Sequence, residues 1–274
     1  MRVTGAVGSF GDLGAQDHFC WVHSSPGDYR ACLAEFFAHG LDRGLRPGYA
    51  GLASAENLRG DLAAGDGLLA GEAVTVISLE DIVQPGKPAD PTKIVARYAA
   101  ATEEALAAGY RGLRVSTDVT DLVRAPGQQE SFASCEFLLE RYASLHPLSA
   151  MCSYGAELGE TVKQFAALHA AAPAGLTPFQ LIAREDGAVG LIGDIDAVCQ
   201  AEFEWALKRI QPAEGGLILD LSAAGFMDHQ GLQILDEFVE KCPVQVIVRS
   251  LPLSARRVVG LLGLDRFFAQ LERE

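Results

Sequence analysis

The sequence has few basic residues, and this shortage limits the partners that the protein can bind. Its 274 residues include 22 Lys and Arg against 36 Asp and Glu, so the formal net charge is −14. Charge of this sign repels the phosphate backbone of nucleic acids and the headgroups of anionic lipids. We therefore expect neither nucleic acid nor a membrane surface among the partners.

Paired cysteines and an N-terminal apolar segment are also missing. The six cysteines form no CxxC motif, and a disulfide framework would be unusual in a chain of this length. Glycines at positions 5, 8, 11 and 14 interrupt the apolar residues near the N-terminus, so no export signal is predicted. We interpret the cysteines as reduced thiols and the protein as cytoplasmic.

The longest uncharged run, residues 164–183, has the length of a membrane span but contains Pro173, Gly175 and Pro178. We interpret it as the end of a helix, a linker and a strand, with residues 169–178 as an exposed connector. The hydrophobic content of 49% is enough for buried cores. The chain length then favours two domains, 1–172 and 178–274, joined by a linker at 173–177.

Short β-like runs alternate with helical stretches in the first domain. The expected strands are 18–23, 48–53, 74–79, 113–117 and 150–154, and the expected helices are 28–43, 55–64, 91–108 and 130–145. This alternation predicts an α/β fold with a mostly parallel sheet that helices cover on both faces. In such sheets the ligand crevice lies at the carboxyl ends of the strands.

The loop after the first of these strands, residues 24–28, stands where a nucleotide-binding P-loop would lie. A Walker loop needs the pattern G-x-x-x-x-G-K-[ST], whose Lys reaches the phosphates and whose hydroxyl holds magnesium. This loop has one glycine, no Lys, and Asp28, whose charge would repel phosphate. We therefore expect no tight ATP binding and no ATP hydrolysis, which leaves the crevice for a different small molecule.

Three segments resemble the MEDS sensory domain: DHFCWVH at 17–23, GYRGLRVSTDVTDLVR at 109–124 and MCSYGAE at 151–157. The resemblance covers roughly residues 10–172. It implies a degenerate RecA-like (P-loop NTPase-like) fold of bacterial and archaeal regulators that sense small, often methylated or halogenated, compounds. The resemblance does not specify the ligand.

Polar side chains on or after the expected strands are the candidates for ligand binding. They are His18, Cys20, His23, Ser24, Asp118 and Tyr154. Asp118 follows an apolar strand as a Walker-B acid would, but the absence of a Lys loop leaves that role without a partner. Asp118 has two remaining roles, lining the pocket or capping the next helix or turn, and Tyr154 has an alternative role in packing.

The same strand contains four residues of metal-ligand type, Asp17, His18, Cys20 and His23. Side chains alternate on a strand, so His18 and Cys20 share one face, Asp17 and His23 share the other, and at most two of the four converge without a bend. A closed zinc site needs four ligands, and a fourth would have to come from elsewhere, for instance Cys152 or Asp118. We favour a buried cysteine beside a hydrogen-bonded histidine and assign no metal.

In the second domain the expected elements are a hairpin at 179–184 and 188–193, strands 217–221 and 244–248, and helices 196–210, 230–240 and 254–262. The segments GLIGDIDAVCQAEFEWAL, ILDLSAAGFMDHQGLQIL and LPLSARRVVGLLGLDRFF resemble a STAS domain over roughly residues 177–272. This is the α/β fold of bacterial anti-sigma factor antagonists and stressosome proteins. The resemblance implies signalling through an anti-sigma factor or another regulatory protein.

The turn after the third STAS strand departs from the family pattern. Switchable members have Asp-Ser-[Ser/Thr]-Gly there, and a kinase phosphorylates a hydroxyl; this chain has Asp228, His229, Gln230 and Gly231. Because neither central residue has a hydroxyl, the usual phosphate ester cannot form. We predict that Asp228, His229 and Gln230 bind a partner without this switch.

An apolar stripe on helix 196–210 contains Val198, Ala201 and Trp205, almost opposite the stripe that faces the sheet. A surface helix that is apolar on the side facing away from its own sheet usually packs against another protein surface. Trp205 is therefore a candidate contact with the first domain, with a second copy in a homodimer, or with a partner protein.

The favoured hypothesis is a non-catalytic sensor-regulator whose first domain binds a small-molecule signal and whose STAS domain transmits it. One alternative is a constitutive scaffold of the stressosome type. The other is an enzyme that uses Cys20 with His18 or His23, although the sequence has no nucleophile elbow, HExxH motif or P-loop lysine.

Overall fold

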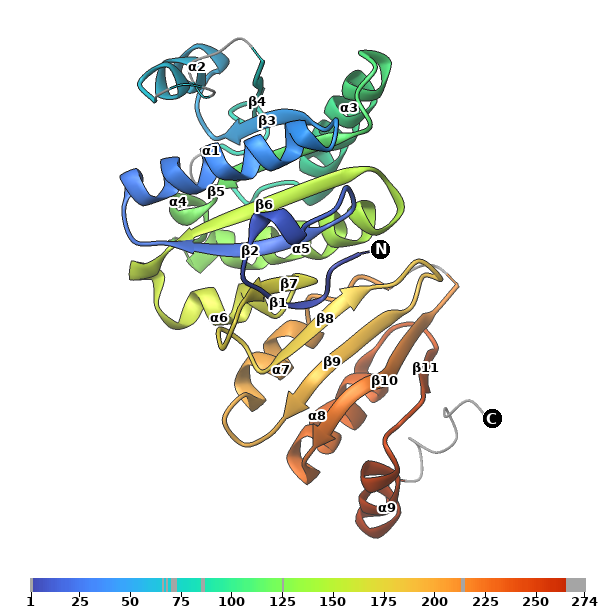
Figure 1. The fold of residues 1–274 in the computed structure, drawn as a ribbon. Helices are drawn as coiled ribbons and strands as arrows, with labels where there is room; N and C mark the ends of the chain where they lie inside the picture. The colour runs from blue at the N-terminus through green and yellow to red at the C-terminus, as the bar shows by residue number, and fades with distance from the viewer. Residues whose placement is uncertain are drawn as a thin grey trace.

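The computed structural model describes residues 2–65, 67, 69, 73–84, 87–124, 126–212 and 215–264. It contains a seven-stranded sheet followed along the chain by a four-stranded sheet, each with its own helices (Figure 1). The end of the predicted STAS segment, residues 265–272, lies outside the described residues. Within the described part of the chain, no helix is both long enough and apolar enough to cross a membrane.

All neighbouring strands of the first sheet are parallel, in the order β1-β7-β2-β6-β5-β3-β4. The strands are β1 (Gly5–Val7), β2 (His18–His23), β3 (Arg46–Gly51), β4 (Thr75–Ser78), β5 (Leu113–Asp118), β6 (Leu148–Gly155) and β7 (Ala171–Pro173). The expected α/β fold with a mostly parallel first sheet is confirmed. The sequence did not predict β1 and β7, the two strands at the edge of the sheet next to β2, because each is only three residues long.

Six α-helices and two 3-10 helices accompany the described part of this sheet. They are α1 (Pro26–Asp42), α2 (Ala55–Ala63), α3 (Pro91–Ala107), α4 (Thr120–Arg124), α5 (Pro126–Leu145), α6 (Glu160–Ala166), η1 (Phe10–Asp12) and η2 (Ala156–Leu158). The starts of α1 and α3 follow from local chemistry. Ser25 and Asp90 cap them, and a proline stands in the first turn of each.

Alternation along β2 divides its side chains between two apolar cores. Phe19 packs against Phe36 of α1, with a ring separation of 5.4 Å. Cys20 faces the other way, into the larger core that α3 and α5 help to form. The two faces of this one strand therefore have different surroundings, because successive side chains point to opposite sides of a sheet.

The expectation of an exposed connector at 169–178 is wrong for its first half. His169, Ala171 and Ala172 are buried, and Ala171 and Ala172 lie in β7, which pairs with β1. Small side chains allow this segment to fit closely inside the sheet. Exposed positions begin at Ala174, between the end of β7 and the start of β8.

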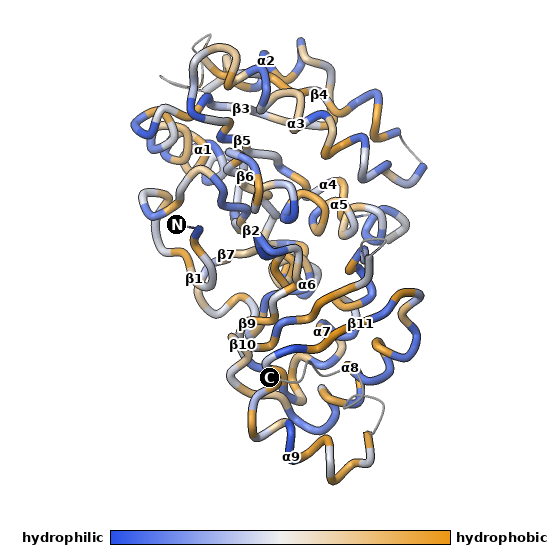
Figure 2. Tube along the Cα trace, turned by 90° about the vertical axis from the view of Figure 1, so that its right-hand side faces the viewer, coloured by the Kyte–Doolittle hydropathy of each residue, from blue (hydrophilic) through white to orange (hydrophobic). Residues whose placement is uncertain are grey.

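The second sheet has the order β11-β10-β9-β8 and mixes one antiparallel pair, β8 with β9, with parallel pairs. Its strands are β8 (Phe179–Ala183), β9 (Val189–Ile195), β10 (Leu217–Met227) and β11 (Val246–Arg249), and its helices are α7 (Gln200–Leu207), α8 (His229–Lys241) and α9 (Leu253–Leu262). Figure 2 shows apolar residues along these strands and alternating polar and apolar positions on α8, whose apolar face is buried. The predicted hairpin is present, and β10 is longer than expected.

The two halves are in direct contact. The Leu181 N–H of β8 donates to the Ala167 carbonyl just after α6 at 2.7 Å. Nη1 of Arg2, near the N-terminus, donates to the Ala183 carbonyl of β8 at 2.8 Å. The ring of Trp205 in α7 lies 5.4 Å from that of Phe165 in α6. The half with the four-stranded sheet therefore packs on α6 and on the segment that leads from it.

Candidate functional site

A cleft of about 660 Å³ opens at the carboxyl ends of β2, β3 and β5. His23 and Ser24 end β2, Tyr49 and Gly51 belong to β3, and Asp118 ends β5. The chain leaves β2 through α1 and returns as β3, with β6 and β5 lying between those strands in the sheet. A crevice where connections diverge in this way is the usual ligand position in parallel α/β sheets.

The charge of this cleft is negative. Among the described residues, four carboxylates line it, those of Asp61, Asp118, Asp121 and Glu157, together with the guanidinium of Arg124 and the imidazole of His23. Arg124 is already paired with Asp121 at 3.3 Å and with Glu157 at 2.9 Å. A phosphate or carboxylate ligand would therefore enter an unfavourable potential.

His23 and Asp118 form the polar centre of the cleft. Nε2 of His23 lies 3.4 Å from Oδ2 of Asp118, and the imidazole ring is 5.1 Å from that of Tyr29. The Asp118 carboxylate raises the pKa of His23 against the opposing effect of burial. Burial would raise the pKa of Asp118, but His23 and the hydrogen bonds from Thr120 outweigh it and lower that pKa. Both shifts favour the charged pair.

Both ring nitrogens of His23 are buried, and neither makes a hydrogen bond among the described residues. Nε2 still has the ion-pair contact with Asp118 at 3.4 Å, whereas Nδ1 has no contact of this kind within the described part of the chain. Asp118, in contrast, both lines the cleft and caps the turn that follows β5. Its Oδ1 accepts hydrogen bonds from the Thr120 N–H and hydroxyl at 3.0 and 2.6 Å, while its Oδ2 faces His23.

The loop at 24–28 forms a helix cap and does not form a phosphate cradle. The Ser25 hydroxyl accepts from the Asp28 N–H at 3.1 Å, and the Asp28 carboxylate accepts from the Ser24 N–H at 2.8 Å. This arrangement resembles a capping box, except that the Asp28 carboxylate accepts from the residue before the N-cap. A carboxylate therefore occupies the anion-binding position at the start of α1.

His18, Cys20 and Tyr154 do not line the cleft. They are fully buried on the opposite face of the sheet, toward α5. Alternation along β2 separates His18 from His23, and the Tyr154 hydroxyl donates to Glu136 inside the fold. We therefore remove these three residues from the cleft and keep His23, Ser24 and Asp118.

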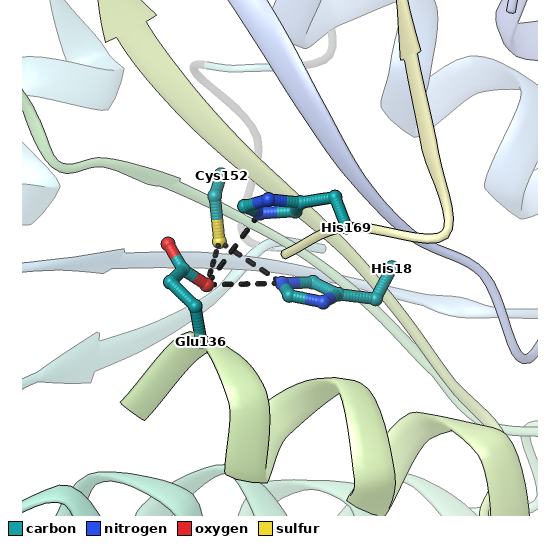
Figure 3. Close-up of side chains that lie close together, drawn as sticks. All are labelled: His18, Glu136, Cys152 and His169. Atoms are coloured by element: carbon teal, nitrogen blue, oxygen red, sulfur yellow. Dashed lines mark hydrogen bonds and ion pairs between the residues drawn. The ribbon is translucent and has the colours of Figure 1, made fainter. Parts of the chain in front are cut away.

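A compact cluster of ionisable side chains surrounds His18 on that buried face (Figure 3). Nε2 of His18 lies 3.1 Å from Oε2 of Glu136 and 3.4 Å from Sγ of Cys152. Sγ of Cys152 is 3.2 Å from the same Glu136 oxygen, and Nε2 of His169 is 3.5 Å from it. All four side chains are buried, and one nitrogen, sulfur or oxygen atom from each lies within 4.8 Å of the others.

Two further charged groups support the cluster from one side. Nδ1 of His18 lies 3.2 Å from Oε2 of Glu140, and the other oxygen of Glu140 accepts from Arg2. Burial would lower the pKa of His18, but the two glutamates outweigh it and raise that pKa. Burial would raise the pKa of Glu136, but His169, His18 and the Tyr154 hydroxyl lower it to about 2.

His169 differs from His18 in charge. Its Nδ1 lies 2.8 Å from the Phe165 carbonyl, which only accepts hydrogen bonds, so Nδ1 carries the proton. Burial and the nearby His18 lower the pKa of His169 to about 4. The ring is therefore neutral near pH 7, and its Nε2 presents a lone pair to the cluster.

The turn before α8 forms a second polar surface, at the far end of the second sheet. Asp228 caps α8 by accepting from the Gly231 N–H at 2.7 Å, and His229 and Gln230 are exposed. Gln200 of the neighbouring α7 donates to Gln230 at 2.6 Å. Phe226, 49% exposed, lies on the strand that leads into this turn.

The sequence profile described as "MEDS: MEthanogen/methylotroph, DcmR Sensory domain" matches residues 17–170. The chain belongs to the MEDS family. A STAS domain profile matches residues 182–274. Among solved structures, the chain is similar to an anti-sigma factor antagonist from Mycobacterium paratuberculosis, with 32% sequence identity over 32% of this chain and 76% of that chain and a TM-score of 0.28. No curated protein matches the chain significantly.

Both resemblances found in the sequence are therefore confirmed. The combination of a MEDS sensory domain with a STAS domain fits a signalling regulator. The cleft and the buried cluster both lie in the MEDS domain, and the Asp228 turn lies in the STAS domain.

Trp205 packs against the MEDS domain. Contact with the first domain was one of the three contacts predicted for this residue. Its ring contacts Phe165 of α6, and the Arg209 guanidinium lies 5.1 Å above its other side. We therefore withdraw Trp205 from the partner-binding residues. Val198, from the same predicted stripe, is 85% exposed, because α7 begins only at Gln200 and Val198 lies in the turn before it.

Sequence reasoning missed Glu136, Glu140 and His169. A signal for the first two was present, since carboxylates four residues apart in a helical segment lie on one face, and here apolar residues surround them. His169 gave no such signal, because it stood in a stretch of small residues that resembled a linker. Cys152 had been named as a ligand that could join His18 from elsewhere in the fold.

Proposed function

We propose that this protein is a non-catalytic, cytoplasmic signalling regulator whose MEDS domain binds a small molecule in the His23–Asp118 cleft. The STAS domain then passes the ligand state to a regulatory protein such as an anti-sigma factor. In this proposal residues 1–172 are the sensory domain, 173–177 the linker and 178–274 the output domain. The carrying observation is the unpartnered, buried Nδ1 of His23 in a cleft large enough for a small molecule.

The charge of the cleft supports a neutral or cationic ligand. Asp61, Asp121 and Glu157 surround the His23–Asp118 pair, and Arg124 is engaged by two of them. Tyr49 adds an aromatic surface, and burial with the nearby Asp61 and Asp118 raises its pKa to about 12, so it stays a neutral hydrogen-bond donor. A donor, an acceptor and an aromatic face suit a small methylated or halogenated compound of the kind associated with the family.

The state of the thiols supports a non-catalytic role. Cys20, Cys135 and Cys152 are buried, and burial raises the pKa of each thiol well above its usual value. A nucleophilic cysteine needs a thiolate that the substrate can reach. The enzyme alternative based on Cys20 with His18 or His23 lacks this access, because Cys20 is not exposed at the cleft.

The surface around Asp228 supports partner binding through the STAS domain. His229 and Gln230 are exposed and follow the exposed Phe226 closely along the chain, so this stretch offers both polar and apolar groups to a partner. The similarity to an anti-sigma factor antagonist favours an anti-sigma factor as the partner class. No hydroxyl stands at positions 229 and 230, which favours control by the ligand over control by phosphorylation at this turn.

Thermal unfolding of the full-length protein tests the ligand. The compounds are tetramethylammonium, trimethylamine, methanol and dichloromethane, with phosphate and acetate as anionic comparators. We expect at least one neutral or cationic compound, and neither anion, to raise the melting temperature. Asp118→Asn should abolish the shift, whereas Asp12→Asn, at an exposed position outside the cleft, should keep it.

Native mass spectrometry of the freshly purified protein completes this test, since a ligand outside the panel would be retained as a mass adduct. If no compound stabilises the protein and no adduct is found, the scaffold alternative replaces the sensor. Hydrolysis of any ester or nucleotide in a turnover assay would instead favour the enzyme.

The phosphorylation-independent output is tested with a matched pair of proteins. Incubation with ATP and an anti-sigma-type kinase should leave the wild-type STAS turn unmodified, while His229→Ser restores a hydroxyl at the family position. Stoichiometric phosphate on the wild-type turn, or on the exposed Ser222 of β10, would contradict the proposal. If Asp228→Lys still binds the partner, the contact surface lies elsewhere on the protein and not at this turn.

A further inference from the structure

We propose that His18, Glu136, Cys152 and His169 bind one divalent transition-metal ion of the zinc class inside the MEDS domain. The ligands come from four parts of the fold: β2, α5, β6 and the segment between α6 and β7. This site is separate from the His23–Asp118 cleft and does not depend on the ligand proposed there.

The spacing of the four donor atoms fits a tetrahedral ion. Zinc bonds of about 2.0–2.3 Å place neighbouring ligand atoms roughly 3.3–3.8 Å apart. The measured separations are 3.1 Å for His18 Nε2 to Glu136 Oε2, 3.4 Å for His18 Nε2 to Cys152 Sγ, 3.2 Å for Cys152 Sγ to Glu136 Oε2 and 3.5 Å for His169 Nε2 to Glu136 Oε2. The two remaining pairs, between His169 and His18 and between His169 and Cys152, lie within 4.8 Å. Small side-chain shifts would complete the coordination.

The groups behind the ligands orient them as metal sites require. Nδ1 of His18 faces the Glu140 carboxylate, and Nδ1 of His169 faces the Phe165 carbonyl, so both rings direct Nε2 inward. The second oxygen of Glu136 accepts from the Tyr154 hydroxyl. Histidine ligands of metals characteristically donate their other N–H to a carboxylate or a carbonyl in this way.

The unpartnered Nε2 of His169 points to an occupant at the centre of the cluster. Nδ1 of His169 faces the Phe165 carbonyl, so Nε2 is the ring atom that faces the other ligands, and it is buried without a hydrogen-bond partner among the described residues. Oε2 of Glu136 lies 3.5 Å from this atom. A polar atom left unsatisfied in a dry interior is unfavourable, and a metal ion bound by both atoms would satisfy it.

The charges around the site also balance when an ion is bound. Coordination uses the lone pair of His18 Nε2 and the thiolate of Cys152, so any protons on these atoms leave as the ion binds. The Glu136 carboxylate and the Cys152 thiolate would offset the two positive charges of the ion, and Arg2 offsets the Glu140 carboxylate. The buried interior then holds no uncompensated charge.

The donor set and its burial define the class of the site. Two imidazoles, a thiolate and a carboxylate suit zinc and disfavour magnesium or calcium, which prefer oxygen ligands. The protein supplies all four ligands and all are buried, which is the arrangement of a structural site. By binding Glu136, His18 and Cys152, the ion would cross-link α5 to β2 and β6. It would also hold His169, two residues from Ala167, whose carbonyl accepts the hydrogen bond from Leu181 in the STAS sheet.

Metal analysis of the full-length protein tests the proposal. Protein purified under reducing conditions without chelator should contain one zinc per chain by inductively coupled plasma mass spectrometry. Cys152→Ala should lose the ion. Cys20→Ala should retain it, because Cys20 is an equally buried thiol on the same strand face that is not among the four ligands.

A cobalt titration of wild-type protein, stripped of metal by chelator, avoids dependence on the folding of variants. We expect saturation at one Co²⁺ per chain, a thiolate-to-metal charge-transfer band and the intense d–d bands of four-coordinate cobalt. The melting temperature should fall on chelation and recover with Zn²⁺. Absence of the charge-transfer band in the wild type, or full metal content in Cys152→Ala, would overturn the proposal.

Discussion

His18 and His23 lie on the same strand, yet their surroundings differ completely. His23 ends β2 at an open cleft and faces Asp118, whereas His18 is sealed beneath α5 between Glu136 and Glu140. The five-residue separation puts them on opposite faces, since side chains alternate along a strand. The His23–Asp118 pair at the open cleft is suited to bind and release a ligand. The buried cluster around His18 is suited to hold strands and helices together.

The energetic consequence of removing a charge should differ as strongly between the two regions. A buried ion left without its partner is costly, because neither water nor another group compensates it. A charge at the rim of the cleft remains solvated, and its ion pairs are screened.

The largest effect is expected for Glu136→Ala. This change leaves His18 with one carboxylate partner in a dry interior and should lower the free energy of unfolding by about 3–5 kcal/mol. The matched change Glu157→Ala at the exposed cleft rim should cost less than about 1 kcal/mol. Urea unfolding followed by circular dichroism measures both. Equal losses of unfolding free energy in the two variants would show that the buried cluster and the cleft rim do not differ in this respect.

A second matched pair uses the arginines. Arg2→Ala removes one of the two partners of Glu140 and the hydrogen bond to the Ala183 carbonyl, so we expect a loss of about 1.5–3 kcal/mol in the free energy of unfolding. Arg124→Ala breaks only exposed pairs with Asp121 and Glu157 and should cost at most about 1 kcal/mol. The same unfolding measurement applies. A larger loss for Arg124→Ala would show that the cleft carries more of the stability than we infer.

A smaller effect is expected for the pH dependence of the cleft pair. The pKa of His23 is raised, so its stabilisation is complete below about 6.5 and is lost as pH rises through the folded value. The pKa of Asp118 is lowered, so its stabilisation is complete above about 4 and is lost as pH falls through the folded value. The pair therefore contributes most between these two values.

An NMR titration of the His23 ring resonance in wild type and Asp118→Asn measures this coupling. The variant should show a lower His23 pKa, because the largest stabilising influence on the imidazolium has been removed. Asp12→Asn should leave the His23 titration unchanged. An unaltered pKa in Asp118→Asn would mean that the two side chains are not coupled.

No measurable effect is expected from MgATP. The Asp28 carboxylate occupies the start of α1, and the cleft around Asp118 is negative, so neither offers a phosphate site. Isothermal titration calorimetry should show no binding at micromolar nucleotide, and hydrolysis should not exceed that of buffer. Micromolar affinity, or hydrolysis that Asp118→Ala abolishes, would contradict the assignment of the cleft.

Much of the architecture could be predicted from local patterns. The strand at 18–23 and the helix at 55–64 were placed within a residue of β2 and α2, because apolar periodicity and turn residues mark such boundaries. The β7 strand could not be found, because three small residues have no periodicity and gain their place only by pairing with β1. Helix 196–210 was predicted too long, because Asp196 instead closes a turn by accepting from the Val198 N–H.

Local sequence patterns are enough to predict the two domain types, the missing P-loop chemistry, the missing hydroxyl at the STAS turn and the separation of His18 from His23. These follow from motifs, from short-range spacing and from the alternation of side chains along a strand. The meeting of Glu136 and His169 with His18 and Cys152 depends on the packing of the whole domain, because the four residues come from two strands, a helix and a connecting segment that are far apart in the sequence. No local pattern encodes that packing, so the sequence identified His18 and Cys152 as possible ligands but not Glu136 or His169.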